Sequence, residues 1–261
     1  MKTGLICFDI GNTAIDVGVF ENDRLIVRWK HPTEKAWGRD NYARLLEQSL
    51  TERGIAVSAI RRAALSSVVR GFQELFQEVV GTLFQTQPLI VTTYLDLGIR
   101  VTWERPWTVG IDRLLSTGEA YRLYGGPVIV AGVGTAITVD VVSADGVFLG
   151  GAIAPGLRTG LDALVLKTSL LPNVPLEDPS RVIGTDTPSF LLSGVVVGAA
   201  GLIDGLVKQM TKEVGAEVKV VGTGGDVERV RPWSETIEII DHDLSLKGLR
   251  WVYERNREYK V

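Results

Sequence analysis

Apolar and polar positions along the first half of the chain follow two different periods. Short runs rich in apolar and β-branched residues, bounded by turn residues, predict strands at residues 4–10, 15–20, 25–27, 63–69 and 89–91. Apolar residues that recur at helical spacing predict helices at residues 40–53, 71–84 and 113–124. Strands that alternate with helices in this way are typical of an α/β fold.

The second half of the chain repeats the plan of the first. Its apolar pattern predicts strands at residues 128–130, 136–142, 147–149 and 217–221, and helices at residues 189–212 and 244–257. Each half opens with a strand, a Gly/Thr turn and a second strand, and Asp9–Ile15 aligns with Gly132–Ile137 once one residue is omitted. We therefore predict two related lobes, residues 1–124 and 125–261, with a cleft between them.

The composition is that of an ordinary globular protein. Hydrophobic residues make up 45% of the chain, charged residues make up 23%, and the net charge is −3, which excludes a disordered chain. The 29 glycines exceed the usual share of about 7%, but they show no period of three, which excludes collagen. The 28 basic and 31 acidic residues are mixed along the chain, so we expect no nucleic-acid partner.

Several features argue against a secreted or membrane protein. The single cysteine, Cys7, allows no internal disulfide, which is typical of a reducing compartment, and we expect a cytoplasmic protein. The first apolar run ends at Asp9 and is too short for a signal peptide or a membrane span. The helix at residues 193–210 contains Asp204 and four glycines at small-xxx-small spacing. We expect that this helix does not insert into a membrane. Its glycines are expected either to pack closely inside the second lobe or to make a subunit contact.

The two Gly/Thr turns suit phosphate binding. A glycine leaves backbone N–H groups accessible and the neighbouring threonine adds a hydroxyl, so two such turns facing one cleft could hold a triphosphate. Asp9, directly before the first turn, is then placed to meet a hydrated Mg²⁺. The alternative interpretation is that the glycines only make tight hairpins and that Asp9 caps a turn. Neither a GxxxxGK[ST] loop nor a GxGxxG helix start occurs in the chain.

Residues 110–113, Gly-Ile-Asp-Arg, are a second candidate for chemistry, directly before a predicted helix. Asp112 is a natural N-cap for that helix, with Arg113 as a surface charge. In a kinase cleft, Asp112 could instead accept the proton of an attacking hydroxyl while Arg113 holds an anionic substrate. The two roles are compatible.

A set of short motifs extends in order over nearly the whole chain: residues 9–13, 66–69, 110–113, 134–136, 150–156, 171–172, 184–187, 224–226 and 246–256. This set resembles the type III pantothenate kinases, which belong to the acetate and sugar kinase/Hsc70/actin superfamily. Each motif alone is weakly specific, whereas the ordered set is strongly specific.

The resemblance implies an α/β protein with two ribonuclease H-like lobes, mixed sheets flanked by helices, and a nucleotide cleft between them. It implies ATP- and Mg²⁺-dependent phosphorylation of pantothenate to 4′-phosphopantothenate, the first step of coenzyme A biosynthesis, by a homodimer that completes the substrate site. The ATP residues carried over are Asp9, Ile10, Gly11, Asn12, Thr13, Ala14, Ile15, Asp16 and Thr135, with Mg²⁺ near Asp9. The pantothenate residues carried over are Gly110, Ile111, Asp112, Arg113 and Thr187, with Asp112 as proton acceptor.

Two positions depart from the family pattern. The family usually has an aspartate two residues before the glycine of the second motif, where it binds a monovalent cation such as K⁺ or NH₄⁺, whereas this chain has Gly132. A glycine offers no carboxylate, so we expect a weak or unusual K⁺ dependence. Residues 103–106, Trp-Glu-Arg-Pro, stand where the family commonly has Tyr and then Asn-Pro, which alters the expected pocket wall.

Two alternative functions stay open at this point. Gly132 is compatible with a catalytically impaired enzyme or a non-enzymatic regulator or binding protein on the same fold. A kinase of the same superfamily that acts on a sugar or a short carboxylic acid would need another role for residues 110–113.

Overall fold

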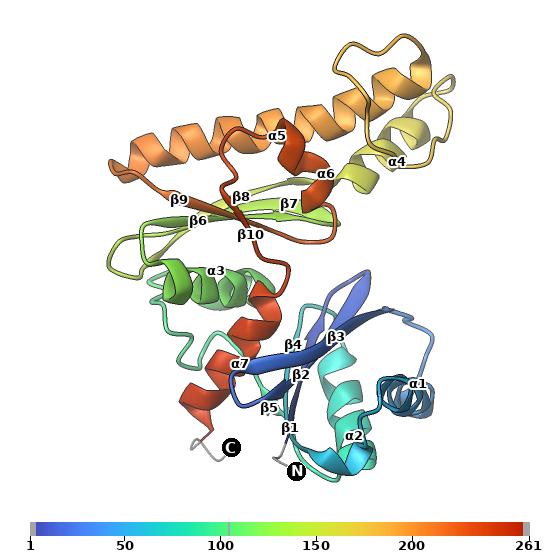
Figure 1. Ribbon diagram of the computed structural model, residues 1–261, viewed down its shortest axis with the longest axis vertical. Coiled ribbons are helices and arrows are strands. Elements are labelled where there is room, and N and C mark those ends of the chain that lie inside the picture. Colours follow the sequence, from blue (N-terminus) through green and yellow to red (C-terminus); the bar gives the residue numbers. More distant parts are fainter. Residues whose placement is uncertain (1–3, 104, 258–261) are drawn as a thin grey trace. The chain divides into compact units, whose positions relative to one another are not determined.

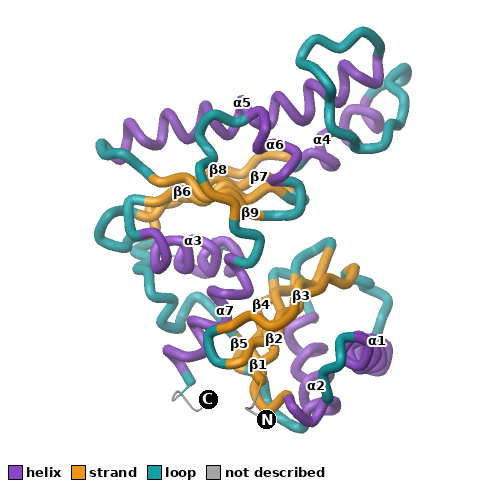
Figure 2. The backbone as a smooth tube through the Cα atoms, viewed as in Figure 1, coloured by secondary structure: helices purple, strands orange, loops and turns teal. Residues whose placement is uncertain are grey.

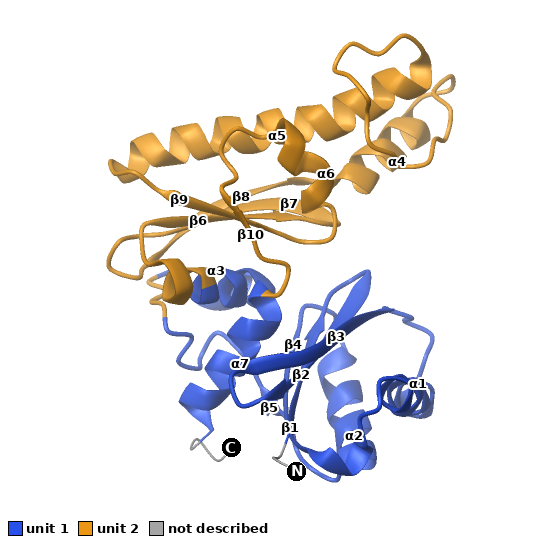
Figure 3. Cartoon of the chain, in the orientation of Figure 1, with its two compact units in different colours: residues 1–98, 103–119, 244–261 blue, residues 99–102, 120–243 orange. Residues whose placement is uncertain are grey.

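A computed structural model describes residues 4–103 and 105–257, which form two compact units (Figures 1 and 3). Unit 1 takes residues 1–98, 103–119 and 244–261, and unit 2 takes residues 99–102 and 120–243. These units differ from the predicted lobes mainly at the C-terminal end, where the last helix belongs to unit 1. The division into lobes of residues 1–124 and 125–261, each with one Gly/Thr turn, stays a prediction.

Unit 1 is built on a five-stranded mixed sheet in the order β3-β2-β1-β4-β5. Its strands are β1 (Gly4–Ile10), β2 (Ala14–Glu21), β3 (Arg24–Pro32), β4 (Ile60–Ser67) and β5 (Leu89–Ile90). β1 pairs antiparallel with β2 and parallel with β4. The first three strands therefore form a meander, and the last two join by helical crossovers.

Helices cover both faces of the unit 1 sheet. They are α1 (Arg39–Glu52), α2 (Phe72–Phe84), α7 (Leu244–Asn256) and the single turns η1 (Val57–Ala59) and η2 (Pro106–Thr108). Because side chains alternate along a strand, Ile6, Phe8 and Ile10 of β1 face one way and pack into a core with residues of α1 and α2. Figure 2 shows both helices beside the sheet. α7 packs against β1, β2 and β4, and it contains Leu246, close to Gly18.

Unit 2 has a second five-stranded mixed sheet, in the order β10-β9-β6-β7-β8. Its strands are β6 (Val128–Val133), β7 (Ala136–Val142), β8 (Phe148–Pro155), β9 (Lys219–Thr223) and β10 (Ile239–Ile240). Its helices are α4 (Leu157–Lys167), α5 (Thr187–Val214), α6 (Val227–Val230) and the turn η3 (Arg231–Trp233). Read from β8, the strand order and directions repeat those of unit 1. α3 (Ile111–Tyr124) runs from one unit into the other.

α5 is the main core helix of unit 2. Its residues Val196, Ala200 and Ile203 are buried in the core with the sheet. With 28 residues it is long and apolar enough to cross a membrane by length and composition, a test that the core helix of a globular protein also passes. The Asp204 carboxylate accepts hydrogen bonds from the Ser234 and Thr236 hydroxyls, 2.7 and 2.6 Å away, which ties α5 to the loop before β10.

The four glycines of α5 are not closely packed inside unit 2. A Cβ added at Gly194, Gly198, Gly201 or Gly205 would meet nothing within 4 Å. The expectation of close packing within the lobe is therefore wrong, because these positions lie on the open side of the helix. A subunit contact stays possible for them.

The predicted fold class is confirmed: both units are mixed sheets flanked by helices. The sequence missed α4, α6 and β10 and underestimated the length of β3 and β8.

Candidate active site

The first predicted phosphate turn, residues 11–13, connects β1 to β2, and we call it the first loop. The Gly11 N–H donates to the Ala14 carbonyl at 2.9 Å, which closes the turn, while Asn12 and Thr13 are exposed. Ile10 and Ile15, on either side, are buried in the unit 1 core. The loop is therefore a short exposed turn on a rigid base.

Neighbouring segments hold the first loop from two sides. The Val68 N–H, directly after β4, donates to the Ile10 carbonyl at 3.1 Å. Thr33, directly after β3, donates its N–H to the Thr13 carbonyl at 3.0 Å and its hydroxyl to the Gly11 carbonyl at 2.7 Å. Thr33 was not among the predicted residues.

Asp9 lies at the end of β1, partly buried, opposite Asp16 of β2 and Ser66 of β4. The Ser66 hydroxyl donates to Asp9 Oδ1 at 2.8 Å, and the Ser245 hydroxyl at the start of α7 also hydrogen-bonds the carboxyl group. Asp16 is paired with Lys30, 3.0 Å away.

The pKa of Asp9 is raised to about 7, chiefly because burial disfavours the charged form. The negative charge of Asp112 raises this pKa further, whereas the hydrogen bonds from Ser66 and Ser245 lower it. A carboxyl group with such a pKa, shifted by burial and by the charge of a second acidic group, is typical of a functional site.

Asp112 lies in the first turn of α3 rather than at the N-cap position that the sequence suggested, because the helix already begins at Ile111. Its carboxyl group folds back over Gly110, where an added Cβ would lie 2.5 Å from Asp112 Oδ1. Burial raises the pKa of Asp112, and the backbone N–H and the charge of Arg113 oppose that shift. The structure thus places Asp112 in unit 1 near enough to Asp9 for its charge to act on the Asp9 carboxyl group.

The second predicted turn, residues 134–135, connects β6 to β7, and we call it the second loop. The Gly134 N–H donates to the Ala136 carbonyl at 3.0 Å, and Thr135 is exposed. The Asp226 N–H donates to the Val133 carbonyl at 3.0 Å, which docks the Gly-Gly-Asp segment against the end of β6.

Gly132 occupies in unit 2 the place that Asp9 occupies in unit 1. It lies opposite Thr138 of β7 and Thr223 of β9, as Asp9 lies opposite Asp16 and Ser66. A Cβ added at Gly132 would lie 2.7 Å from the Thr138 hydroxyl oxygen. The space next to Gly132 is therefore occupied by a hydroxyl.

Thr187 is the first residue of α5 and belongs to unit 2, whereas the other predicted substrate residues, 110–113, belong to unit 1. It lines a groove of about 640 Å³ between α4 and α5, whose other walls include Leu164, Phe190 and Leu202. Phe190 is 57% exposed. The groove is apolar and open on one side.

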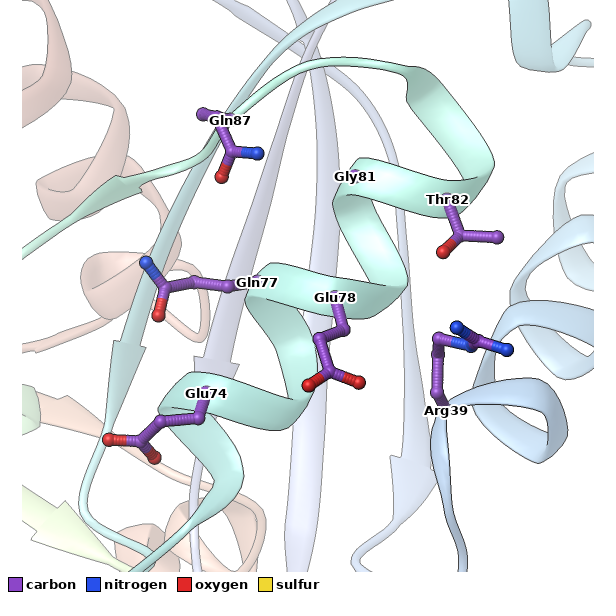
Figure 4. Close-up of a pocket in the computed structure, with 7 residues that line it drawn as sticks. All are labelled: Arg39, Glu74, Gln77, Glu78, Gly81, Thr82 and Gln87. Atoms are coloured by element: carbon purple, nitrogen blue, oxygen red, sulfur yellow. The ribbon is translucent and has the colours of Figure 1, made fainter.

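A second pocket, of about 550 Å³, contains none of the predicted site residues. It lies in unit 1 and is lined by Arg39 of α1 and by Glu74, Glu78 and Thr82 of α2 (Figure 4). In the described part of the chain, no group of three or more His, Cys, Asp or Glu side chains could hold a metal ion. Any Mg²⁺ at Asp9 would therefore rely on water and phosphate oxygens for its other ligands.

Comparison with known proteins extends over nearly the whole chain. A family model described as type III pantothenate kinase matches residues 5–209. The type III pantothenate kinase of Roseiflexus sp. (strain RS-1) is 41% identical over 253 residues, which cover 97% of this chain and 99% of that protein. That of Dehalococcoides mccartyi (strain BAV1) is 37% identical over 253 residues, which cover 97% and 96%.

Two solved structures share the fold at low sequence identity. A protein from Campylobacter jejuni described as a Baf family transcriptional activator has a TM-score of 0.59 at 20% identity and covers 97% of this chain and 98% of its own. Component A of (R)-2-hydroxyglutaryl-CoA dehydratase from Acidaminococcus fermentans has a TM-score of 0.58 at 14% identity, with 99% and 100% covered. At such identities the likeness shows the fold alone.

Proposed function

The chain belongs to the type III pantothenate kinase family, and on this premise we propose that it transfers the γ-phosphate of ATP to the primary hydroxyl of pantothenate. The product is 4′-phosphopantothenate, and the reaction is the first step of coenzyme A biosynthesis. The observation that carries the proposal is the group of Asp9, Asp112 and the first loop within unit 1.

Asp112 is the proposed proton acceptor. The pantothenate hydroxyl oxygen forms the new bond to the γ-phosphorus, the bond from phosphorus to the β–γ bridging oxygen breaks, and ADP leaves. The hydroxyl proton passes to the Asp112 carboxylate, whose burial raises its pKa and so favours proton uptake. Arg113 is the proposed partner of the pantothenate carboxylate.

Asp9 is the proposed site of Mg²⁺, held through water. The donor chemistry fits, because Mg²⁺ is usually bound by one or two carboxylates together with waters and substrate phosphates. When bound, Mg²⁺ neutralises charge on the phosphates. Ser66 and Ser245 favour the charged form of Asp9 that such a role needs.

The two loops are the proposed phosphate contacts. Asn12, Thr13 and Thr135 are exposed on short turns, where backbone N–H groups and hydroxyls can meet phosphate oxygens. Two further carried-over residues, Ile10 and Ile15, are buried in the unit 1 core on either side of the first loop.

We propose that no monovalent cation binds at position 132. Gly132 has no carboxylate, and the Thr138 hydroxyl oxygen lies only 2.7 Å from the position that an aspartate Cβ would take. A hydroxyl is a neutral and weaker ligand than a carboxylate, so activity should depend only weakly on K⁺ or NH₄⁺.

The proposed assembly is a cytoplasmic homodimer that uses the groove between α4 and α5. The open glycines of α5 permit close approach of a second copy, and Phe190 and Leu164 at the rim would be covered by it. Gly198→Arg, at a position where an added Cβ meets nothing within 4 Å in the protomer, should shift the mass from dimer to monomer in light scattering. An unchanged mass would argue against this surface.

The decisive experiment measures ADP release by the purified protein with ATP, Mg²⁺ and pantothenate, with and without K⁺. Pantothenate-dependent release in both conditions supports the proposal. ATP binding without transfer to pantothenate would favour a regulator, and transfer to a sugar or a short carboxylic acid would favour another kinase of the superfamily.

A further inference from the structure

Each of the two loops is attached to the residue that follows the third strand of its sheet. In unit 1 that residue is Thr33, after Pro32, and its N–H donates to the Thr13 carbonyl at 3.0 Å. In unit 2 it is Gly156, after Pro155, and its N–H donates to the Thr135 carbonyl at 3.1 Å. The same backbone bond therefore occurs twice.

A threonine hydroxyl adds a further bond in each unit. In unit 1 the Thr33 hydroxyl donates to the Gly11 carbonyl at 2.7 Å. In unit 2 the Thr159 hydroxyl, in the first turn of α4, donates to the Thr135 carbonyl, also at 2.7 Å. Two different sequence positions thus provide the same kind of contact.

The donor comes from another position in unit 2 because the residue after the third strand there is a glycine with no room for a side chain. A Cβ added at Gly156 would clash with the Gly134 carbonyl oxygen and would lie 2.6 Å from that of Thr135. No side chain fits at position 156, so the hydroxyl has to come from Thr159, three residues later.

Fixing a carbonyl also fixes the N–H group of the same peptide. The peptide is planar and trans, so its C=O and N–H point in opposite directions. With the Gly11 carbonyl directed at Thr33, the Asn12 N–H points to the opposite side of the first loop. The bond from the Thr159 hydroxyl to the Thr135 carbonyl likewise fixes the backbone of Thr135. The Thr135 hydroxyl is a proposed phosphate contact.

We propose that Thr33 and Thr159 are positioning residues for the nucleotide: each hydroxyl holds one loop in the conformation that binds the phosphates of ATP. This inference rests on the proposed function of the two loops. It adds Thr33 and Thr159 to the proposed site as residues that act through the loops and not by contact with a substrate.

The test compares Thr33→Val and Thr159→Val with the native protein. Valine keeps the shape and the backbone N–H but removes the hydroxyl. We expect each change to weaken binding of a non-hydrolysable ATP analogue with Mg²⁺, measured by calorimetry, by about 2–10-fold, the range for one hydrogen bond. KM for ATP should rise by a similar factor, KM for pantothenate should stay within about twofold, and Thr33→Ser and Thr159→Ser should restore binding.

Thr51→Val and Thr211→Val are matched controls. Each removes a threonine hydroxyl that donates to a helix carbonyl at 2.8 Å, in α1 and α5 respectively, away from both loops. Analogue affinity should stay within about twofold in both controls.

The outcomes separate the inference from the proposed function. If the native protein binds no ATP analogue, the proposed function fails and the inference fails with it. If the native protein binds and the two valine variants bind equally well, the inference alone is overturned. It is also overturned if the valine variants raise both KM values equally, because that result indicates a general structural role.

Discussion

The hairpins β1–β2 and β6–β7 are built alike but carry different chemistry. In both, the turn glycine donates to the carbonyl that begins the next strand, and the residue after the third strand donates to the turn threonine. In both, a segment that follows a parallel neighbour strand donates to the last residue of the first strand, Ile10 or Val133. The backbone of the loop is thus duplicated almost bond for bond.

The side chains at the end of the central strand are not duplicated. Unit 1 places Asp9 between Asp16 and Ser66, with Asp112 near enough to raise its pKa. Unit 2 places Gly132 between Thr138 and Thr223. The repeated fold provides two loops of the kind proposed to bind phosphate, whereas of these two equivalent positions only the one in unit 1 carries a carboxylate.

The largest expected effect comes from substitution of Asp112, because Asp112 is the proposed proton acceptor and lies in unit 1. Asp112→Asn should lower kcat by about 10²–10⁴-fold, the range for loss of general-base help. Steady-state kinetics with ATP and pantothenate measures this, and thermal unfolding should show that the variant is folded. Turnover close to that of the native protein would exclude the assigned role.

Asp9 should destabilise the ligand-free protein when it is charged. Its folded pKa of about 7 lies above the ordinary value of 3.8, so this site favours folding at low pH and loses that contribution as pH rises through 7. Asp9→Asn should therefore stabilise the free protein by about 2–4 kcal/mol at pH 8. The gain should shrink as pH falls from 7 toward 4.

Denaturant unfolding at several pH values tests the Asp9 prediction. Asp162→Asn serves as the control, because Asp162 is exposed on α4 and paired with Arg158 rather than with any group around Asp9. A gain for Asp9→Asn that does not change with pH would contradict the assignment.

Gly156→Ala disturbs the contact between the second loop and Gly156, the residue that follows β8. The added methyl group has no room beside the Gly134 carbonyl, so we expect a loss of about 1–3 kcal/mol in unfolding free energy and a higher KM for ATP. Gly81→Ala in α2, where the new Cβ makes only an ordinary contact at 3.7 Å, should instead stabilise by about 0.5–1 kcal/mol. Equal stability of the two variants would show that the second loop tolerates a side chain.

Gly132→Asp gives unit 2 the acidic side chain that unit 1 has at the equivalent position. Among the single substitutions proposed in this comparison, it should have the smallest effect on activity. Alone, it places a Cβ against the Thr138 hydroxyl and should leave the weak K⁺ response unchanged. Combined with Thr138→Ala, it gains room for a carboxylate and should give a K⁺ stimulation of activity above that of the native protein. A strong K⁺ requirement in the native protein would refute the proposed absence of this cation site.

Most of the fold was predictable because its signals are local. Apolar runs at residues 4–10 and 136–142 and helical spacing at 71–84 match β1, β7 and α2. α6 and β10, with four and two residues, are too short to show a period. β3 was underestimated because it alternates exposed charged residues such as Arg28 and Lys30 with more buried ones.

The family was also readable from the sequence, and the comparisons confirm it. The roles of the site residues stay predictions. Asp9 and Asp112 were named from their motifs, but nothing in the sequence indicated Ser245, which is far from Asp9 along the chain. One feature of the sequence could have indicated Thr33 and Gly156. Each directly follows a proline, and that proline ends the third strand of its sheet.

The sequence by itself determined the strands, the turns, their duplication and the family, because periodicity and turn chemistry depend on neighbouring residues. Only the tertiary structure decided which groups surround Asp9, what fills the space beside Gly132, and which hydroxyls hold the two loops. Burial, and with it the raised pKa of Asp9, arises where strands and helices distant in sequence pack together, and no local pattern records that proximity.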